Sequence, residues 1–421
     1  MRYISTRGAA PALGFEDVML AGMAPDGGLY VPETIEPWTA GEIARLPNRT
    51  LSEIGYRALR PYTRGVLDAT IFEALVVDAL NFPIPLVEVE PGIYSLELFH
   101  GPTLAFKDVG ARVMARLMAS VDKGEQSLTV LAATSGDTGS AVAHAFHGVP
   151  HTRVVVLYPF GRVSPTQEAQ LTMFNAEAGN VRAYAVDGSF DDCHRLTREA
   201  FRDEHLSTAA RLTSANSVNV GRLLPQMVYY FQAVAQLGGA SAGDLVICTP
   251  SGNFGNLTAG LMAKRAGLPV SRFVAATNVN DVVPEYLRTG IYSPRASVRT
   301  VANAMDVGAP SNFERIRALY NDDLEAIRHD IAGAVYDDAA VVAEIGRVHR
   351  RYGSLLDPHG AIAWLAIDPT AALDDRPANA LRTTGDHSIP AVQIDCVGHD
   401  GNLSEPDKTD ECRIVRRALH N

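Results

Sequence analysis

The sequence predicts an α/β protein with two domains built on parallel or mixed sheets and a mostly helical N-terminal region. From about residue 94 onward, short apolar runs alternate with helical stretches, and glycine-rich loops follow two of the runs. The length of 421 residues exceeds one ordinary core. We therefore expect three domains: a mixed, mostly helical one over 1–93, an α/β domain over 94–205, and a larger α/β domain over 206–421.

Apolar spacing gives the individual elements. In the N-terminal region, I-F-E-A-L-V-V-D-A-L-N-F is compatible with a helix over 71–82. Later buried runs predict strands over 128–134, 153–159, 181–186, 244–249 and 272–277. Helices are expected over 167–178 and 189–204, the second with Ser189 or Asp191 as its cap.

Composition excludes several classes of function. The net charge of −11 argues against a nucleic-acid or anionic-lipid partner. No segment has the length and apolarity of a signal peptide or a membrane span. The four cysteines form no C-x-x-C pair, so no metal site is predicted, and a reduced, cytoplasmic compartment is the simple interpretation. Whether the chain is a monomer or a homodimer stays open.

Two glycine-rich loops stand between a strand and a helix. In S-G-N-F-G-N (251–256), Gly252 and Gly255 permit close backbone approach, and successive N–H groups before a helix can bind a phosphate. An ordinary turn explains this loop about equally well. In S-G-D-T-G-S (135–140), Ser135 and Thr138 could bind a carboxylate or phosphate. Asp137 and Thr138 could equally cap the following helix.

Lys107 lies in F-H-G-P-T-L-A-F-K-D (99–108), at the expected start of an amphipathic helix. The apolar face of that helix is formed by residues 109, 113, 117 and 121, and Phe106 precedes the lysine. Apolar surroundings and a helix N-terminus favour a neutral amine, the form that makes an imine. A surface lysine paired with a carboxylate is the ordinary alternative.

A polar cluster occupies S-A-N-S-V-N-V-G-R (214–222). The guanidinium of Arg222 is suited to a phosphate or carboxylate, and asparagines suit hydroxyl and amide groups. A capped helix starting at Ser217 or Asn219 explains part of the cluster, but not Ser214, Asn216 and Arg222 together.

In this order along the chain, these segments resemble the threonine synthase family. Further matching pieces are L-A-G-M-A-P-D-G-G-L-Y-V-P (20–32), V-D-G-S-F-D-D-C (186–193) and L-L-D-P-H-G-A (355–361). The resemblance covers about residues 3–366. It implies fold type II of the pyridoxal-phosphate enzymes, with the cofactor between two α/β domains.

The resemblance also implies roles for residues. Lys107 becomes the Schiff-base lysine, beside Phe106 in the cofactor site. The cradle for the cofactor phosphate consists of Gly252, Asn253, Phe254, Gly255 and Asn256. Substrate contacts are assigned to Ser135, Asp137, Thr138, Ser214, Asn216 and Arg222.

The implied reaction converts O-phospho-L-homoserine and water to L-threonine and phosphate, by γ-elimination followed by addition of water at Cβ. Two alternatives remain open. A related phospholyase would release 2-oxobutyrate and ammonia, and a non-catalytic homologue would only bind ligand.

The end of the chain departs from the family pattern. Members usually close with a T-A-H-P-A-K-F-like motif, whose Thr or Ser partners the pyridine nitrogen of the cofactor. This chain instead reads A-L-R-T-T-G-D-H-S-I-P-A over 380–391, where Thr383 or Thr384 could substitute, and we assign Thr383. The polar stretch from about 370 fits a divergent terminus, a disordered one, or a sequence shifted out of its ancestral frame.

Overall fold

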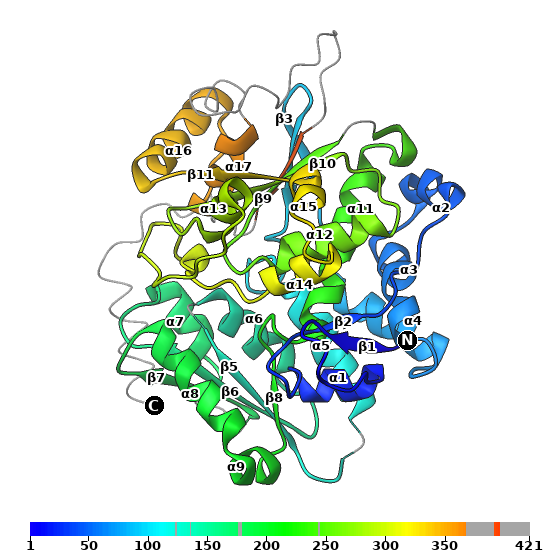
Figure 1. Ribbon diagram of the computed structural model, residues 1–421, viewed down its shortest axis with the longest axis vertical. Coiled ribbons are helices and arrows are strands. Elements are labelled where there is room, and N and C mark those ends of the chain that lie inside the picture. Colours follow the sequence, from blue (N-terminus) through cyan, green and yellow to red (C-terminus); the bar gives the residue numbers. More distant parts are fainter. Residues whose placement is uncertain (123, 135, 176–178, 243–244, 368–390, 396–421) are drawn as a thin grey trace.

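Two sheets form the frame of the chain in this computed structural model, one in the upper half of Figure 1 and one in the lower half. The structure describes residues 1–122, 124–134, 136–175, 179–242, 245–367 and 391–395. The upper sheet has six strands, in spatial order β11 (Ile331–Val335), β10 (Arg272–Thr277), β9 (Val246–Pro250), β12 (Ala391–Asp395), β4 (Ile93–Glu97) and β3 (Leu86–Glu90).

The lower sheet has four strands, and all of its pairings are parallel. In spatial order they are β7 (Val181–Val186), β6 (Thr152–Pro159), β5 (Leu128–Ala133) and β8 (Leu212–Ser214). In the upper sheet the β3–β4 pair is antiparallel and the other pairings are parallel. The predicted α/β class with parallel and mixed sheets is confirmed.

The N-terminal region carries a two-stranded antiparallel ribbon and several helices. The ribbon pairs β1 (Tyr3–Ser5) with β2 (Tyr30–Pro32). The helices are α1 (Phe15–Ala21), α2 (Ala40–Ala44), α3 (Leu51–Thr63) and α4 (Ala69–Ala79), with a 3-10 turn η1 (Leu46–Asn48). Thr39 and Thr50 start α2 and α3 with capping boxes to Glu42 and Glu53.

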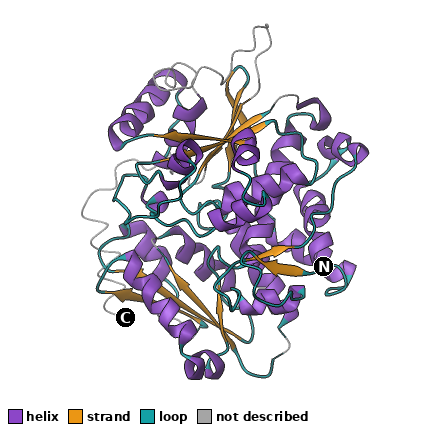
Figure 2. Ribbon diagram, in the orientation of Figure 1, coloured by secondary structure: helices purple, strands orange, loops and turns teal. Residues whose placement is uncertain are grey.

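Helices cover both sheets (Figure 2). Those before residue 210 are α5 (Lys107–Val121), α6 (Asp137–Phe146), α7 (Pro165–Thr172), α8 (Phe190–Arg202) and α9 (Glu204–Ala209). Those that follow are α10 (Val220–Leu223), η2 (Leu224–Gln226), α11 (Met227–Gln236), η3 (Gly239–Ala242), α12 (Gly255–Arg265), α13 (Val282–Thr289), η4 (Asn303–Met305), α14 (Phe313–Leu319), α15 (Leu324–Asp330), α16 (Asp338–Tyr352) and α17 (Pro358–Ile367).

The expected apolar faces are buried. All six residues of β5 are buried, as a strand covered on both faces requires. On α5 the predicted face of Val109, Val113, Leu117 and Val121 is at most 3% exposed. This helix therefore holds its first residue, Lys107, on a rigid support.

The three-domain division stays a prediction, but the strands near its boundaries have partners across them. β3 and β4 belong to the sheet that contains β9, β10 and β11, and β8 pairs with β5. Among the described residues, no helix is long and apolar enough to cross a membrane.

Candidate active site

Loops at the carboxyl ends of β4, β5, β8 and β9 line one cavity of about 1110 Å³. This is where ligands bind in sheets of parallel strands. The cavity brings together twelve of the predicted site residues: Phe106, Lys107, Asp137, Thr138, Ser214, Asn216, Arg222, Gly252, Asn253, Phe254, Gly255 and Asn256. Ser135 and Thr383, also predicted, lie outside the described residues.

Lys107 is held by the buried residue that follows it. The carboxylate of Asp108 accepts hydrogen bonds from the backbone N and the hydroxyl of Thr103, both at 2.8 Å. Gly101 packs so closely on Asp108 that a Cβ there would lie 2.5 Å from Oδ2. The segment before α5 is thereby folded against the helix, and the burial of Asp108 raises the pKa of its carboxyl.

The amine of Lys107 donates to the carboxylate of Asp137 at 2.9 Å. The other oxygen of Asp137 accepts from Nε2 of Gln167 at 2.7 Å. Burial raises the pKa of Asp137, but the charges of Lys107 and His359 outweigh burial and lower it to about 2. Asp137 does not cap α6, because the N-cap is Gly136, so the capping alternative for Asp137 is wrong.

The loop between β9 and α12 is shaped for an anion. Its described contacts include no acceptor for the backbone N–H groups of residues 252–256. Phe254 has φ 61° and ψ 12°, a left-handed conformation that is unusual for a bulky residue. A Cβ on Gly252 would lie 2.6 Å from Cα of Met305, so only glycine fits there. These N–H groups point from a helix N-terminus, where phosphate binding is favoured.

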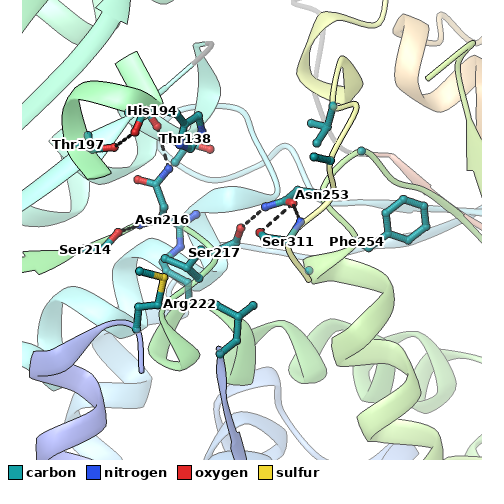
Figure 3. A pocket seen from close by; sticks show the side chains of 18 of the residues that line it. Thr138, His194, Thr197, Ser214, Asn216, Ser217, Arg222, Asn253, Phe254 and Ser311 are labelled. Atoms are coloured by element: carbon teal, nitrogen blue, oxygen red, sulfur yellow. Dashed lines mark hydrogen bonds between the residues drawn. The ribbon is translucent and has the colours of Figure 1, made fainter. Parts of the chain in front are cut away.

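The side chains of this loop hold it in place (Figure 3). Nδ2 of Asn253 donates to the hydroxyl of Ser217 at 2.7 Å, and its Oδ1 accepts from the backbone N of Ser311 at 2.6 Å. Asn256 donates to Pro250 O at 2.8 Å and accepts from Ser251 Oγ at 2.9 Å. Both predicted asparagines thus support the loop through bonds within the protein.

Arg315 holds the Ser217 segment in place through hydrogen bonds to its backbone carbonyls. It is fully buried and donates to the carbonyls of Tyr30, Ser217 and Val218 and to Oδ1 of Asn312, at distances of 2.6–3.1 Å. Burial lowers its pKa to about 9. The N-terminal region is thereby tied to the predicted 214–222 cluster. Sequence reasoning missed Arg315, which belongs to none of the motifs.

Asn216 and Arg222 keep unused polar atoms in the cavity wall. Nδ2 of Asn216 donates to Ala133 O at 2.9 Å, which leaves its Oδ1 buried and unpartnered. Arg222 donates through Nη1 to Ala215 O at 2.9 Å, and its Nε is buried and unpartnered. Buried polar atoms normally have partners, so these two point to a ligand. The amide oxygen needs a donor, and the guanidinium Nε needs an acceptor.

His359, from L-L-D-P-H-G-A, also lines the cavity, although the sequence predicted no role for it. Its Nδ1 lies 2.5 Å from Oδ2 of Asp357, and Ala304 N donates to its Nε2 at 3.3 Å. Burial lowers the pKa of His359, but Asp357 and Asp137 outweigh burial and raise it. The contact with Ala304 requires an unprotonated Nε2. At 3.3 Å it is weak, so the carboxylates decide the charge of the ring.

The residues present fit pyridoxal phosphate. A half-buried lysine and an anion loop with free N–H groups open into the same cavity, which suits an aldehyde and a phosphate on one molecule. The described residues include no group of three or more His, Cys, Asp or Glu arranged to hold a metal ion.

Two family models together match most of the chain. The model described as threonine synthase N terminus matches residues 2–80, and the model described as pyridoxal-phosphate dependent enzyme matches residues 80–380. Curated relatives agree. The chain is 45% identical over 354 residues to threonine synthase of Haemophilus influenzae, covering 84% of this chain and 81% of that protein. It is 42% identical over 355 residues to threonine synthase of Escherichia coli, covering 84% and 82%.

Solved structures share the fold. The crystal structure of threonine synthase from Escherichia coli gives a TM-score of 0.84 at 38% identity, covering 94% of this chain and 88% of that chain. A threonine synthase from Brucella melitensis with pyridoxal phosphate bound gives 0.84 at 37% identity, covering 94% and 89%. Maize serine racemase, at 15% identity and a TM-score of 0.56, shares the fold alone. The chain thus belongs to the threonine synthase family of pyridoxal-phosphate-dependent enzymes.

Proposed function

We propose that this chain converts O-phospho-L-homoserine and water to L-threonine and phosphate, using pyridoxal phosphate held by Lys107. The observation that carries the proposal is the shared cavity of Lys107, the 252–256 loop and the unpartnered atoms of Asn216 and Arg222. The names of the relatives, threonine synthase at 42–45% identity, support the same reaction. Sequence composition leads us to expect the cytoplasm as its location, which stays a prediction.

The 252–256 loop would hold the cofactor phosphate through its backbone N–H groups, and Lys107 would hold the aldehyde carbon. Bound there, the cofactor supplies the electron sink that stabilises negative charge at Cα of the substrate. The pyridine-nitrogen partner assigned to Thr383 remains a proposal outside the described residues.

Lys107 is the proposed base and acid at the reacting carbons. With its amine freed by the incoming substrate, it removes the proton at Cα and later returns one there. Asp137, ionised at neutral pH, keeps the lysine amine directed into the cavity through the 2.9 Å contact. Loss of a proton at Cβ permits the phosphate to leave from Cγ. A proton must then be added at Cγ, which becomes the methyl group, before water adds at Cβ.

Arg222 is the proposed donor to the substrate phosphate, because Nε is a buried donor without a partner. Burial lowers the pKa of Arg222 to about 10, so it stays charged at neutral pH. Asn216 presents an acceptor oxygen, which suits the substrate amine better than its phosphate. Ser214 accepts from Asn216 N at 3.2 Å and keeps its own hydroxyl proton to donate.

The test follows all products of one reaction. The protein loaded with pyridoxal phosphate is incubated with O-phospho-L-homoserine, and threonine, phosphate and 2-oxobutyrate are measured over time. We expect threonine and phosphate in equal amounts. If 2-oxobutyrate predominates, the chain is a phospholyase that does not complete the addition of water. If no phosphate is released, the chain is a non-catalytic binder.

A spectrum tests the cofactor assignment separately. Lys107→Ala should remove the near-visible absorbance of lysine-bound pyridoxal phosphate, while Lys264→Ala should keep it. Lys264 is a suitable control because it bonds Asp330 at 2.8 Å and is not among the cavity residues. Equal colour in both variants would overturn the role of Lys107.

A further inference from the structure

One face of helix α8 forms a wall of the catalytic cavity. The cavity-lining residues of this helix are Phe190, His194, Thr197, Arg198, Phe201 and Arg202. Their spacing of four, three, one, three and one residues places them on a single helical face. None of them belongs to the cofactor or substrate groups assigned above. The helix begins within V-D-G-S-F-D-D-C (186–193), a motif to which the proposed reaction assigns no role.

The start of α8 is firmly fixed. The hydroxyl of Ser189 accepts from Asp192 N at 3.2 Å, and the Asp192 carboxylate accepts from Ser189 N at 2.8 Å and from its hydroxyl at 2.7 Å. This capping box explains Ser189 and Asp192 of the motif. Cys193 is buried, and the helix contacts β5 and β6. The wall therefore has a defined orientation toward the cavity.

Two arginines of this wall carry uncompensated charge. No ion pair joins Arg198 or Arg202 to any described residue. Two other arginines at the cavity are already paired, Arg7 with Glu314 and Arg295 with Glu285. Among the carboxylates that line the cavity, Asp137 is paired with Lys107 and Glu314 with Arg7, whereas Asp26 and Asp306 accept hydrogen bonds from the hydroxyls of Ser5 and Thr300 and keep their charge. The α8 wall is thus a positive strip in a protein of net charge −11.

The strip lies on the substrate side of the cavity. In Figure 3, His194 and Thr197 of α8 lie on the same side as Thr138 and Asn216, away from Asn253 of the phosphate loop. The helical rise of about 1.5 Å per residue places Arg198 about 6 Å and Arg202 about 12 Å along the axis from His194. The two arginines therefore extend the wall along the axis of α8 past His194 and Thr197.

We propose that Arg198, supported by Arg202, recruits and selects the phosphate dianion of the substrate. This inference rests on the proposed function, since a phosphorylated amino acid is the ligand. A dianion approaching an acidic protein is repelled unless a local cationic surface offsets the net charge. Arginine also matches the geometry of a phosphate, so the strip would distinguish a phosphorylated substrate from its free alcohol.

The experiment compares three substitutions in α8, each of which removes one positive charge. Arg198→Gln and Arg202→Gln remove the strip. Arg195→Gln is the matched control, because Arg195 lies on the same helix, pairs with Glu199 at 2.9 Å and is not a cavity residue. The rate of threonine formation is measured against O-phospho-L-homoserine over a range of salt concentrations, with thermal unfolding as a check on folding.

We expect Arg198→Gln to raise KM about tenfold, the scale of one charge-assisted hydrogen bond, with kcat nearly unchanged. Arg202→Gln should act less strongly, and Arg198→Lys should restore part of the affinity. The salt dependence of kcat/KM should weaken in the double variant, because fewer charges attract the substrate. Arg195→Gln should remain within about twofold of the unchanged protein.

Binding of inorganic phosphate and of L-homoserine to the cofactor-loaded protein separates the possible outcomes. Arg198→Gln should weaken phosphate binding and leave homoserine binding unchanged. Weakened homoserine binding with unchanged phosphate binding assigns Arg198 to the carboxylate and overturns the proposal. Equal weakening of both ligands also overturns it, because the effect is then not selective for phosphate, and so does behaviour identical to that of Arg195→Gln. If the protein without substitutions forms no threonine, the proposed function is refuted. The titration with inorganic phosphate still tests the role of Arg198 in that case.

Discussion

Gly252→Ala tests the phosphate loop by adding a single methyl group where the backbone of another segment is in close contact. The added Cβ would lie 2.6 Å from Cα of Met305 and 3.1 Å from its C and O atoms, all of them backbone. Carbon atoms need about 3.5–4.0 Å, so the loop or the Met305 segment must move by about 1 Å. Such overpacking costs about 1–3 kcal/mol of stability. It also misdirects N–H groups whose bonds to a charged phosphate contribute about 1.5–3 kcal/mol each.

We therefore expect Gly252→Ala to bind pyridoxal phosphate at least tenfold more weakly, as measured by titrating the cofactor-free protein and following absorbance. Gly333→Ala is the control. Its added Cβ would also lie close to a backbone atom, 2.9 Å from Cα of Pro284, but Gly333 lies in β11, which supplies no residue to the cavity. It should lower stability and spare cofactor affinity. If the two variants bind the cofactor equally well, the close packing behind Gly252 does not shape the phosphate site.

Three further outcomes follow from buried charges. Asp137→Asn should cost roughly 2 kcal/mol in denaturant unfolding above about pH 4, and the difference should vanish as pH falls toward 2, because the folded pKa of about 2 is depressed. Arg315→Met should cost at least about 3 kcal/mol in the same assay, since four acceptors, in two buried and two partly buried hydrogen bonds, lose their donor. The raised pKa of His359 stabilises the fold at low pH, a contribution lost as pH rises through that value. His359→Gln should therefore flatten the stability profile above about pH 6.5, and an unchanged slope would contradict this assignment.

Much of the fold was predictable where apolar runs are bounded by turns. The strands over 181–186 and 272–277 are confirmed at both ends, and Ser189 caps α8 as one of the two expected residues. The helix expected over 167–178 is wrong in its bounds. It begins at Pro165, where Ser164 and Gln167 form a capping box, and α7 ends at Thr172. Pro at the first helical position was the signal overlooked.

β12 was not predicted at all. Its five residues lie in a polar stretch without strong periodicity, and the strand is specified by its neighbours β9 and β4, far away in sequence. Strand preference of this kind depends on tertiary context more than on local sequence.

The site was predictable to the extent that loops after parallel strands converge at one edge. The rule applies to the two glycine-rich loops. Lys107 and the 214–222 cluster were assigned to the same site only through the family resemblance, and residues of all these segments line one cavity in the structure. The rule could not give the pairing of Lys107 with Asp137 or the unpartnered Nε of Arg222, because these depend on side-chain directions fixed by packing. Arg198 was hidden for the same reason. From the sequence, Arg198 cannot be distinguished from the other arginines of α8, because only the structure shows which of them line the cavity.

The order of strands in the upper sheet also determines how long one edge of β4 stays unpaired during synthesis. β4 emerges during synthesis about 300 residues before β12, the strand that pairs with it on one side. At about 5–20 residues per second, the ribosome leaves that edge of β4 unpaired for about 15–60 seconds. The edge is open to other chains in that interval. Pairing with β12 therefore closes an edge that would otherwise remain a site for association between chains.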